Sequence, residues 1–425
     1  MRNIKYLIIG GGIAGTTAAE TIRQNDPAGS IAIISDEPHR LYSRISLMNY
    51  LKGTAPKENL FLRKPEFYKD NRIELIGGAT VKSIAPDKKT AILSSDEELQ
   101  YEKLLLATGA RARIHPLCAK CPDGVYNFWT LEDTDKLVKK IGNAKSAVVV
   151  GGGFVGLELA VSFAERKLET TYLIREPYFW PAALDQVGGE IIQKVLADNG
   201  VNICVNEEVA DIEGNGKLEA VLTKSGKKIP ADILGVGIGT IPNIELAKDA
   251  GIKTNRGIIT NECMETSVPD VWAAGDAAEF YDVIAKKSSL LGNWAFSREQ
   301  GKIAGLGMVG QKTIFKQVPC NSLSFFKCYI GFIGNTVPLP DTQVIVRDLR
   351  DRQGGLASPT GGYTRIFIND GRISGASILN CLPACMPLTK LVQSEISIDD
   401  NIKGRLSDPA TDLAKLSAEI LQTKN

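Results

Sequence analysis

Two glycine-rich segments, each directly after an apolar run, constrain the fold of this chain more than any other feature. They read "YLIIGGGIAGTTAA" (6–19) and "AVVVGGGFVGLELA" (147–160). Both have the spacing G-x-G-x-x-G between a strand-like and a helix-like pattern, which is typical of a loop that holds a dinucleotide pyrophosphate. The residues of these loops are Gly10, Gly12, Ile13, Ala14 and Gly15, and Gly151, Gly153, Phe154, Val155 and Gly156. We therefore expect two dinucleotide sites, one whose ligand stays bound and one whose ligand comes and goes.

The segments around both loops indicate strand–helix–strand units. Residues 4–9 and 31–35 read as buried strands, joined by a helix through about Gln24, and residues 147–150 and 170–174 repeat the arrangement. Parallel strands joined in this way belong to a doubly wound sheet. The sequence therefore predicts an α/β fold with two Rossmann-like domains.

The residue after the second strand of each unit bears on ribose recognition. Asp36 follows Gly15 by 21 residues, where a carboxylate can accept hydrogen bonds from ribose hydroxyls. In the second unit the corresponding position is Ile174, followed by Arg175 and Glu176. Arg175 could pair with a 2′-phosphate, which favours NADPH, whereas Glu176 is close enough to keep NADH open.

Composition limits the classes of function. At 425 residues the chain is expected to form two or three domains, and 44% hydrophobic with 23% charged residues is typical of a globular α/β enzyme. A formal net charge of +1 gives no reason to expect nucleic-acid or acidic-membrane binding. No apolar run approaches 18 residues and the first residues lack a signal-peptide pattern, so we expect a cytoplasmic protein. Only two histidines, His39 and His115, argue against histidine-based metal or triad chemistry, and no metal site is expected.

The chain changes character from about Gln317. Alternating, hairpin-like segments such as "DTQVIVRDL" and "GYTRIFIND" predict a small α+β domain. Asp370-Gly371 between two strand patterns predicts a type I′ hairpin turn. Residues 407–424 predict one amphipathic helix, with an apolar face formed by Leu413, Leu416, Ile420 and Leu421.

Seven segments, in order along residues 4 to about 380, resemble one known superfamily. They are "GGGIAG", "EPHRLYSRISL", "LLLATGA", "FWTLEDTDKL", "GGGFVGLELA", "VWAAGDAAEF" and "REQGKIAG". The chain resembles the FAD-dependent pyridine nucleotide oxidoreductases, and within them most closely the rubredoxin reductase-like proteins and the flavin portion of NADH-dependent nitrite reductase. The resemblance implies a split FAD-binding domain (1–113 and 245–315), an inserted NAD(P)H-binding domain (114–244), a C-terminal α+β domain (316–400) and a tail helix (401–425).

The resemblance also implies roles for single residues. Three would lie at the flavin and act in catalysis: Glu158, Arg44 and Trp294. Others would bind a cofactor: Asp36 at the adenosine ribose, Val81 at adenine, Thr108 and Gly109 along the cofactor, Gly275 and Asp276 at the ribityl and pyrophosphate region beside a helix N-terminus, and Gly239 in the second site. Trp294 could instead be a core tryptophan under a helix, and Glu158 a helix-surface glutamate.

Two departures from the family pattern matter for the flavin. The lysine that relatives place opposite the position of Glu158 is Asn49 here, within "YSRISLMN". A buried carboxylate without that partner should hold its proton more readily. The arginine that normally precedes "TLED" is Trp129, which removes a polar contact with FAD and would add a stacking one.

The eight cysteines do not form an obvious redox centre. The flavin-side segment "YSRISLMNYL" contains no cysteine, and Ser43 and Ser46 cannot perform dithiol chemistry. Cys118 and Cys121 form a CxxC and Cys381 and Cys385 a CxxxC. Structural thiols are the default for both pairs, with a shared metal site or an accessory redox pair as alternatives.

Together these features predict a flavoprotein that accepts hydride from NAD(P)H at FAD and passes electrons to a small redox protein. By resemblance the acceptor is rubredoxin or a ferredoxin-like iron–sulfur protein, and the question of a homodimer stays open. The alternatives are an NAD(P)H oxidase or peroxidase, and a regulatory nucleotide-sensing flavoprotein resembling apoptosis-inducing factor.

Overall fold

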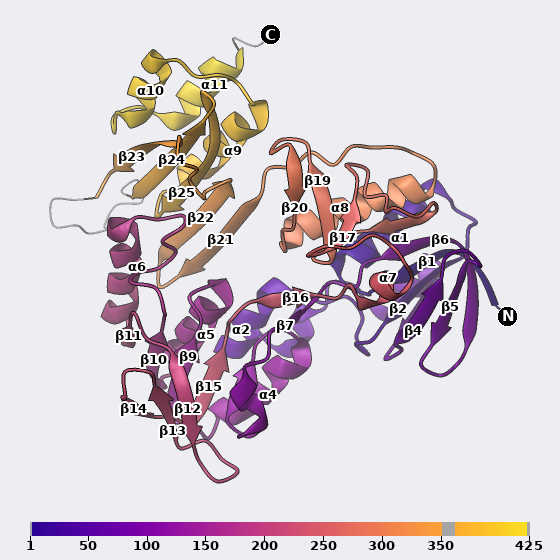
Figure 1. Ribbon diagram of the computed structural model, residues 1–425, viewed down its shortest axis with the longest axis horizontal. Helices are drawn as coiled ribbons and strands as arrows, with labels where there is room; N and C mark the ends of the chain where they lie inside the picture. Colours follow the sequence, from indigo (N-terminus) through magenta and orange to yellow (C-terminus); the bar gives the residue numbers. More distant parts are fainter. Residues whose placement is uncertain (1, 351–361, 423–425) are drawn as a thin grey trace. The chain divides into compact units, whose positions relative to one another are not determined.

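The computed structural model describes residues 2–350 and 362–422 and divides into two compact units (Figure 1). The first unit comprises Met1–Tyr50, Thr54–Arg111 and Thr240–Gln317, and the second comprises Leu51–Gly53, Ala112–Gly239 and Val318–Asn425. The four functional domains expected from the resemblance stay a prediction. Within the described residues, none of the helices is both long and apolar enough to span a bilayer.

The first unit is built on a seven-stranded sheet. The strand order is β3-β2-β1-β6-β5-β4, with β18 paired to β6. Its strands are β1 (Arg2–Ile9), β2 (Ile31–Ser35), β3 (Ile73–Gly77), β4 (Val81–Ala85), β5 (Thr90–Leu93), β6 (Glu98–Leu106) and β18 (Val271–Ala273). Since β1 is parallel to both β2 and β6, the strand order reverses at β1, where doubly wound sheets bind ligands. The two predicted strands and the helix between them, α1 (Ile13–Asn25), are confirmed.

Smaller elements complete the first unit. Its other strands are β17 (Ile258–Thr260), β19 (Ala278–Asp282) and β20 (Lys287–Ser289), which form a separate sheet, and β16 (Thr240–Pro242), which pairs with β7 (Ala110–Ala112). Its remaining helices are α3 (Pro65–Asp70), α7 (Glu245–Asp249), α8 (Trp294–Met308) and the 3-10 turns 44–46 and 57–60. Helix α2 (Leu47–Lys52) ends in the second unit.

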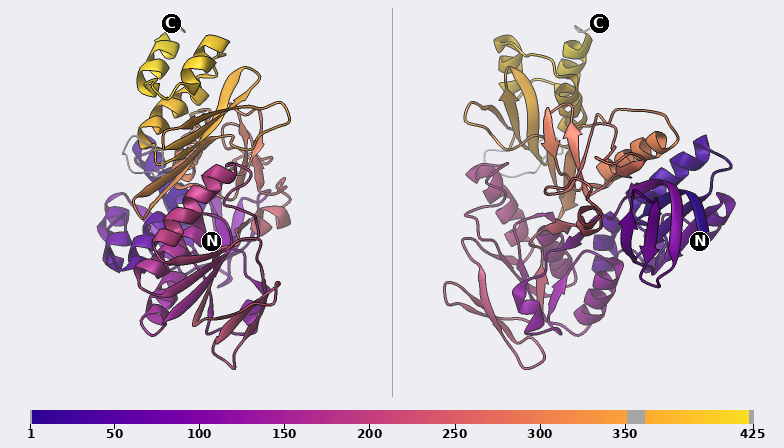
Figure 2. Two further views of the ribbon diagram at one scale, coloured as in Figure 1. Left: turned by 90° about the vertical axis from the view of Figure 1, so that its left-hand side faces the viewer. Right: turned by 45° about the vertical axis from the view of Figure 1, so that its right-hand side comes forward.

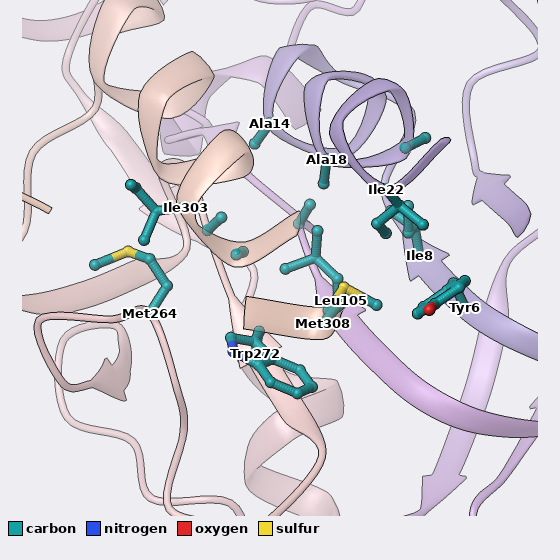
Figure 3. Packing of buried hydrophobic residues seen from close by; sticks show 14 of the residues in the cluster. Tyr6, Ile8, Ala14, Ala18, Ile22, Leu105, Met264, Trp272, Ile303 and Met308 are labelled. Atoms are coloured by element: carbon teal, nitrogen blue, oxygen red, sulfur yellow. The ribbon is translucent and has the colours of Figure 1, made fainter. Parts of the chain in front are cut away.

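Helices α1 and α8 pack side by side on the core of the first unit (Figure 3). The contact is close because glycines of α8 face the backbone of α1. A Cβ on Gly301 would collide with the carbonyl oxygen of Ala14, and one on Gly305 would lie 2.8 Å from that of Ala18. The two glycines of "REQGKIAG" therefore set the distance between these helices.

The second unit repeats the doubly wound arrangement in a five-stranded parallel sheet of order β11-β10-β9-β15-β8. These strands are β8 (Val125–Asn127), β9 (Ser146–Val150), β10 (Glu169–Leu173), β11 (Val201–Cys204) and β15 (Ile233–Val236). The helices are α4 (Leu131–Ile141), α5 (Phe154–Glu165) and α6 (Gln186–Asp198), with a 3-10 turn at 116–119. A small antiparallel sheet follows, formed by β12 (Val209–Glu213), β13 (Ala220–Thr223) and β14 (Lys228–Pro230).

An antiparallel sheet of order β21-β22-β25-β24-β23 also belongs to the second unit. Its strands are β21 (Cys320–Phe325), β22 (Cys328–Gly334), β23 (Gln343–Asp348), β24 (Tyr363–Asn369) and β25 (Arg372–Leu379). Asp370 and Gly371 have φ of 49° and 68° between β24 and β25, which confirms the predicted type I′ turn. Helix α9 (Cys385–Ser394) follows a 3-10 turn at 382–384 and packs on β22 and β25 (Figure 2).

The predicted tail helix over 407–424 is confirmed over Leu413–Gln422, but it begins six residues later than predicted, and the expectation of one helix over 401–425 is wrong. The structure has two helices, α10 (Asp400–Ser407) and α11 (Leu413–Gln422), and residues 423–424 lie outside the described residues. The buried guanidinium of Arg347 donates to the carbonyl oxygens of Leu406, Asp408, Pro409 and Thr411 at 2.7–3.4 Å. Asp408 has an extended backbone directly before Pro409, and since proline disfavours helical backbone at the residue before it, α10 ends there. Leu413, Leu416 and Ile420 are buried as the periodicity predicted.

We predict that Gly301→Ala lowers the free energy of unfolding by about 1–3 kcal/mol, because its Cβ would force α1 and α8 apart. The matched control is Gly404→Ala in α10, where a Cβ would meet nothing within 4 Å. That control should gain about 0.5–1 kcal/mol from helix propensity. Urea unfolding of the three proteins measures both changes, and equal stability of the two variants would contradict the prediction.

Candidate active site

The first glycine loop leaves one open position between two closely packed ones. Gly10 has φ +117°, and a Cβ there would collide with the carbonyl oxygen of Ala107, just after β6. A Cβ on Gly15 would collide with the carbonyl oxygen of Gly10. A Cβ on Gly12, by contrast, would meet nothing within 4 Å. The first and third glycines therefore join helix to strand, and the second leaves space for a ligand to approach the backbone.

The second loop has the same geometry. Gly151 has φ +119°, and its Cβ would collide with the carbonyl oxygen of Gly237, just after β15. A Cβ on Gly156 would collide with the carbonyl oxygen of Gly151, and one on Gly153 would meet nothing within 4 Å. Both predicted loops thus have the same construction at the reversal point of their sheets.

The helices that follow the loops begin without side-chain caps. Gly12 and Gly153 are the N-cap residues of α1 and α5, with no acidic residue in either first turn. The other described helices of eleven residues or more are capped by Thr130, Asp185 and Asn293. Uncapped N–H groups at a helix N-terminus favour an anion. The backbone at each loop therefore fits the pyrophosphate of a dinucleotide.

Asp276 lies beside the first loop, in the turn between β18 and β19. Gly275, before it, has φ +82°, and a Cβ there would lie 3.2 Å from the Cβ of Ala14 in α1. Ser297, in the first turn of α8, donates to Asp276 Oδ1 at 2.9 Å. Asp276 is therefore beside the N-terminus of a helix, as expected, although the chain after "AAGD" continues as a strand. Burial raises the pKa of Asp276, and the Ser297 hydrogen bond and the charge of Arg44 oppose that rise.

Sequence reasoning missed Gln300, which supports this turn. Its Oε1 accepts from the backbone N–H of Gly275 at 2.8 Å. Its buried Nε2 has no hydrogen-bond partner among the described residues. A buried donor without a protein partner calls for water or a ligand. Gln300 lies inside "REQGKIAG", a segment that carries the family resemblance, but no role was predicted for this residue.

Arg44 and Asp36 lie on the segment after β2. Arg44 is in the 3-10 turn 44–46, is ion-paired with Glu37 and lies 5.3 Å from the ring centre of Tyr42. Tyr42 Oη also donates to Glu37 at 2.7 Å. Asp36 is exposed, and its Oδ1 accepts from the N–H of Glu37 at 3.0 Å. Glu37, which orients Arg44, was not predicted, although it stands directly after Asp36.

A second unpredicted residue, Asn243, holds the loop after β6. The Asn243 Nδ2 donates to the Thr108 carbonyl at 2.9 Å and its backbone N–H to the Gly109 carbonyl at 2.9 Å, and Thr108 Oγ1 donates to the carbonyl oxygen of Asn243 at 2.7 Å. Gly109 has φ +64°. Asn243 directly follows the segment "GTIP" (239–242), and nothing else in the sequence indicates that it holds this loop.

The aromatic and apolar residues that were expected at the cofactor, Trp294, Val81 and Trp129, lie in three different parts of the structure. Trp294 is the partly buried first residue of α8, whereas the core tryptophan of this unit is Trp272. Val81 begins the edge strand β4. Trp129 belongs to the second unit, directly before the α4 capping box of Thr130.

Glu158 lies in the second turn of α5, partly buried. Burial raises its pKa to about 7, and the charge of Lys52 opposes this rise. Lys52 ends α2 and forms an ion pair with Glu165 at 3.3 Å. The chain therefore has no lysine at Asn49 but has one three residues later, which at helical spacing shares a helix face with Asn49. The expectation that Glu158 holds a proton more readily agrees with this raised pKa.

The three residues after β10 differ in their burial and in how close their side chains lie to the second glycine loop. Ile174 is buried. Arg175 is exposed and pairs with Glu176 at 2.7 Å. A Cβ on Gly152 would lie 3.2 Å from Glu176 Oε2, so this carboxylate stands over the glycine loop. Gly239, also in the second unit, has φ +99°.

The flavin-side segment "YSRISLMNYL" holds two serines and no cysteine. Ser43 and Ser46 hydrogen-bond to each other at 2.8 Å. Across the described residues no group of three or more histidine, cysteine or acidic side chains is arranged to hold a metal ion.

Comparison with known proteins agrees with this geometry. The chain is 32% identical to the assimilatory nitrate reductase electron transfer subunit of Bacillus subtilis (strain 168) over 321 residues, which are 75% of this chain and 40% of that protein. It is 27% identical to the NAD(P)H nitrite reductase of the same organism over 421 residues, 97% of this chain and 50% of that protein. The chain thus spans half or less of the length of these two relatives.

A solved structure is similar over the whole chain. The covalent putidaredoxin reductase–putidaredoxin complex matches with a TM-score of 0.89 at 27% identity, covering 99% of each chain. The predicted α/β fold with two dinucleotide-binding regions is thereby confirmed. The model of the pyridine nucleotide-disulphide oxidoreductase family matches residues 4–301, and the chain belongs to that family.

Proposed function

We propose that this protein is an FAD-dependent NAD(P)H oxidoreductase that delivers electrons to a small redox protein, a rubredoxin or a ferredoxin-like iron–sulfur protein. The observation that carries the proposal is the pair of glycine loops, which have one geometry and stand at the reversal points of two sheets. Two loops imply two dinucleotides, as an enzyme that moves electrons between cofactors requires. The similar solved structure is a reductase joined to its redox partner, which supports the class of acceptor.

The first unit supplies the groups that would hold FAD. The loop N–H groups would bind the pyrophosphate, Asp36 the adenosine ribose, and Asp276 and Gln300 the neighbouring polar groups. When bound, FAD supplies the redox chemistry, because its ring accepts two electrons as a hydride and releases them singly. Arg44 would supply fixed positive charge, held by Glu37.

The second unit supplies the groups that would hold NAD(P)H. We propose that Glu176 accepts a hydrogen bond from a ribose hydroxyl, because its carboxylate stands over Gly152 and Ile174 is buried. The same carboxylate neutralises Arg175, which weakens the case for a 2′-phosphate. The coenzyme would then be NADH rather than NADPH.

Glu158 would hold a proton on its carboxylate near neutral pH. A cytoplasmic location stays a prediction from the sequence.

Anaerobic reduction by NADH, followed by addition of oxidised rubredoxin or [2Fe–2S] ferredoxin, tests the proposed function. We expect the purified protein to contain FAD and to reduce one of these carriers faster than it consumes oxygen without a carrier. Asp276→Ala should fold but lose most of its flavin, whereas Asp249→Ala, an exposed change in α7, should retain it. Oxygen consumption that equals carrier reduction would instead indicate an oxidase.

We predict that Glu176→Gln lowers the ratio of kcat/KM for NADH to that for NADPH about tenfold. A hydrogen bond to a charged acceptor contributes roughly 1.5–3 kcal/mol, and 1.4 kcal/mol corresponds to a factor of ten. The matched variant Arg175→Gln removes the other half of the pair and should keep the preference for NADH. Steady-state kinetics with both coenzymes measures the ratio, and an unchanged ratio in Glu176→Gln would show that another group reads the ribose.

We predict that stability falls with rising pH because of Glu158. Its pKa is raised from 4.5 to about 7, so between these values the folded state binds more protons than the unfolded state. The free energy of unfolding should therefore fall by about 2–3 kcal/mol from pH 4.5 to pH 7 relative to Glu158→Gln. Lys52→Met should raise the pKa further and extend the fall to higher pH. Urea unfolding at several pH values measures this, and parallel curves for parent and Glu158→Gln would refute it.

A further inference from the structure

Two cysteines far apart in the sequence lie in contact in the second unit. The Sγ atoms of Cys320 and Cys385 are 3.7 Å apart. Cys320 begins the edge strand β21 and Cys385 begins α9 (Figure 1). The two sulfurs are in van der Waals contact, and a disulfide between them would shorten their separation to about 2 Å. The CxxxC spacing suggested Cys381 as the partner, but Cys381 is buried and does not make this contact.

Cys385 is surrounded by groups that stabilise a thiolate. Cys320 hydrogen-bonds to its sulfur, and Tyr329 Oη donates to it at 3.6 Å. The Cys320 hydrogen bond is the main cause that lowers the pKa of Cys385 to about 6, with burial acting against it and Tyr329 and Thr389 assisting. A position at the start of a helix acts in the same direction. The pKa of Cys320 is raised by this hydrogen bond and by burial.

Five other thiols are shifted in the opposite direction. Burial is the main cause that raises the pKa of Cys118, Cys121, Cys263, Cys328 and Cys381. Cys385 is partly exposed, and its neighbours Leu382 and Met386 are 59% and 64% exposed. Cys385 is therefore a partly exposed residue near exposed apolar residues in the sequence.

We propose that Cys320 and Cys385 form a thiol–disulfide exchange centre, in which Cys385 attacks a disulfide substrate and Cys320 completes the exchange. The Cys385 thiolate bonds to one substrate sulfur, the substrate S–S bond breaks, and the other substrate sulfur leaves as a thiolate. Cys320 gives up its proton and attacks Cys385 Sγ, forming the Cys320–Cys385 disulfide and releasing the second substrate thiol. Overall one dithiol and one disulfide become one protein disulfide and two thiols, so two electrons pass to the substrate, and an external dithiol then reduces the protein disulfide and becomes a disulfide itself. No step involves a nucleotide cofactor, so the proposal does not depend on the proposed function.

Thiol release by the full-length flavoprotein tests the exchange. The protein is reduced with dithiothreitol, freed of reductant under nitrogen, and mixed with oxidised glutathione or with insulin as a peptide disulfide. We expect two thiols released per chain and a Cys320–Cys385 disulfide in peptide maps after N-ethylmaleimide quenching. Cys320→Ala should release one thiol and keep a mixed disulfide on Cys385, Cys385→Ser should release none, and Cys118→Ser/Cys121→Ser should behave as the parent.

The two substrates distinguish the source of the disulfide. Release with glutathione alone assigns a small-molecule disulfide, and release with insulin alone assigns a peptide disulfide. No release with either substrate, or a disulfide between other cysteines, overturns the proposal.

The pH dependence of Cys385 alkylation is a second test, and its first measurement is made on the unchanged protein. Iodoacetamide should modify Cys385 with a midpoint near pH 6. In Cys320→Ala the midpoint should rise by at least about one pH unit, because the main hydrogen bond to the thiolate is lost. A parent midpoint at the ordinary value of a thiol, about 8.5, would overturn the role of Cys385 as the attacking group.

Discussion

Contact between backbone and backbone at the glycine loops is the constraint on which the nucleotide-binding structure depends. The carbonyl oxygen of Gly10 lies where a Cβ of Gly15 would be, and that of Ala107 where a Cβ of Gly10 would be. A side chain at either position would move α1 away from the end of β1. The N–H groups of the first turn could then no longer converge on one anion. Gly301 and Gly305 extend this constraint, because they hold α8, and with it Ser297, against the same helix.

Patterns of neighbouring residues in the sequence were sufficient to predict several elements of the fold. The strands on either side of α1, the glycine loops and the Asp370-Gly371 turn each follow from a short pattern of residues. The missed residues act across long separations. Asn243 holds Thr108 from 135 residues away, and no local pattern encodes such a contact. The tail helix was predicted from its apolar periodicity, but the contact of Arg347 with the carbonyl oxygens of the segment before α11 joins residues about 60 positions apart and could not be predicted in this way.

The charge near Glu158 shows how a substitution can be misread. Asn49 suggested a carboxylate with no cation nearby, and the pKa of about 7 agrees with a proton held more tightly. Yet Lys52 still acts on that carboxylate, since positions three apart share a helix face. Its ammonium is also engaged by Glu165, so its charge is divided between two acids. The balance that results, burial against a shared cation, sets the pKa near neutrality, and sequence comparison at one position could not have given it.

The contact between the cysteines also joins residues that are far apart in the sequence. A pair four residues apart would share a helix face if the helix included both, but α9 begins at Cys385 and Cys381 precedes a 3-10 turn. Its sulfur instead lies near Thr364 in β24. The edge of the antiparallel sheet brings Cys320 to Cys385, together with Tyr329 from the neighbouring strand. Every group that determines the reactivity of Cys385 comes from residues 320–389, and none belongs to a glycine loop. The groups that act on Cys385 therefore come from the antiparallel sheet and α9, and this sheet also contacts the second glycine loop, because Phe332 of β22 packs against Phe154 with ring centres 5.8 Å apart.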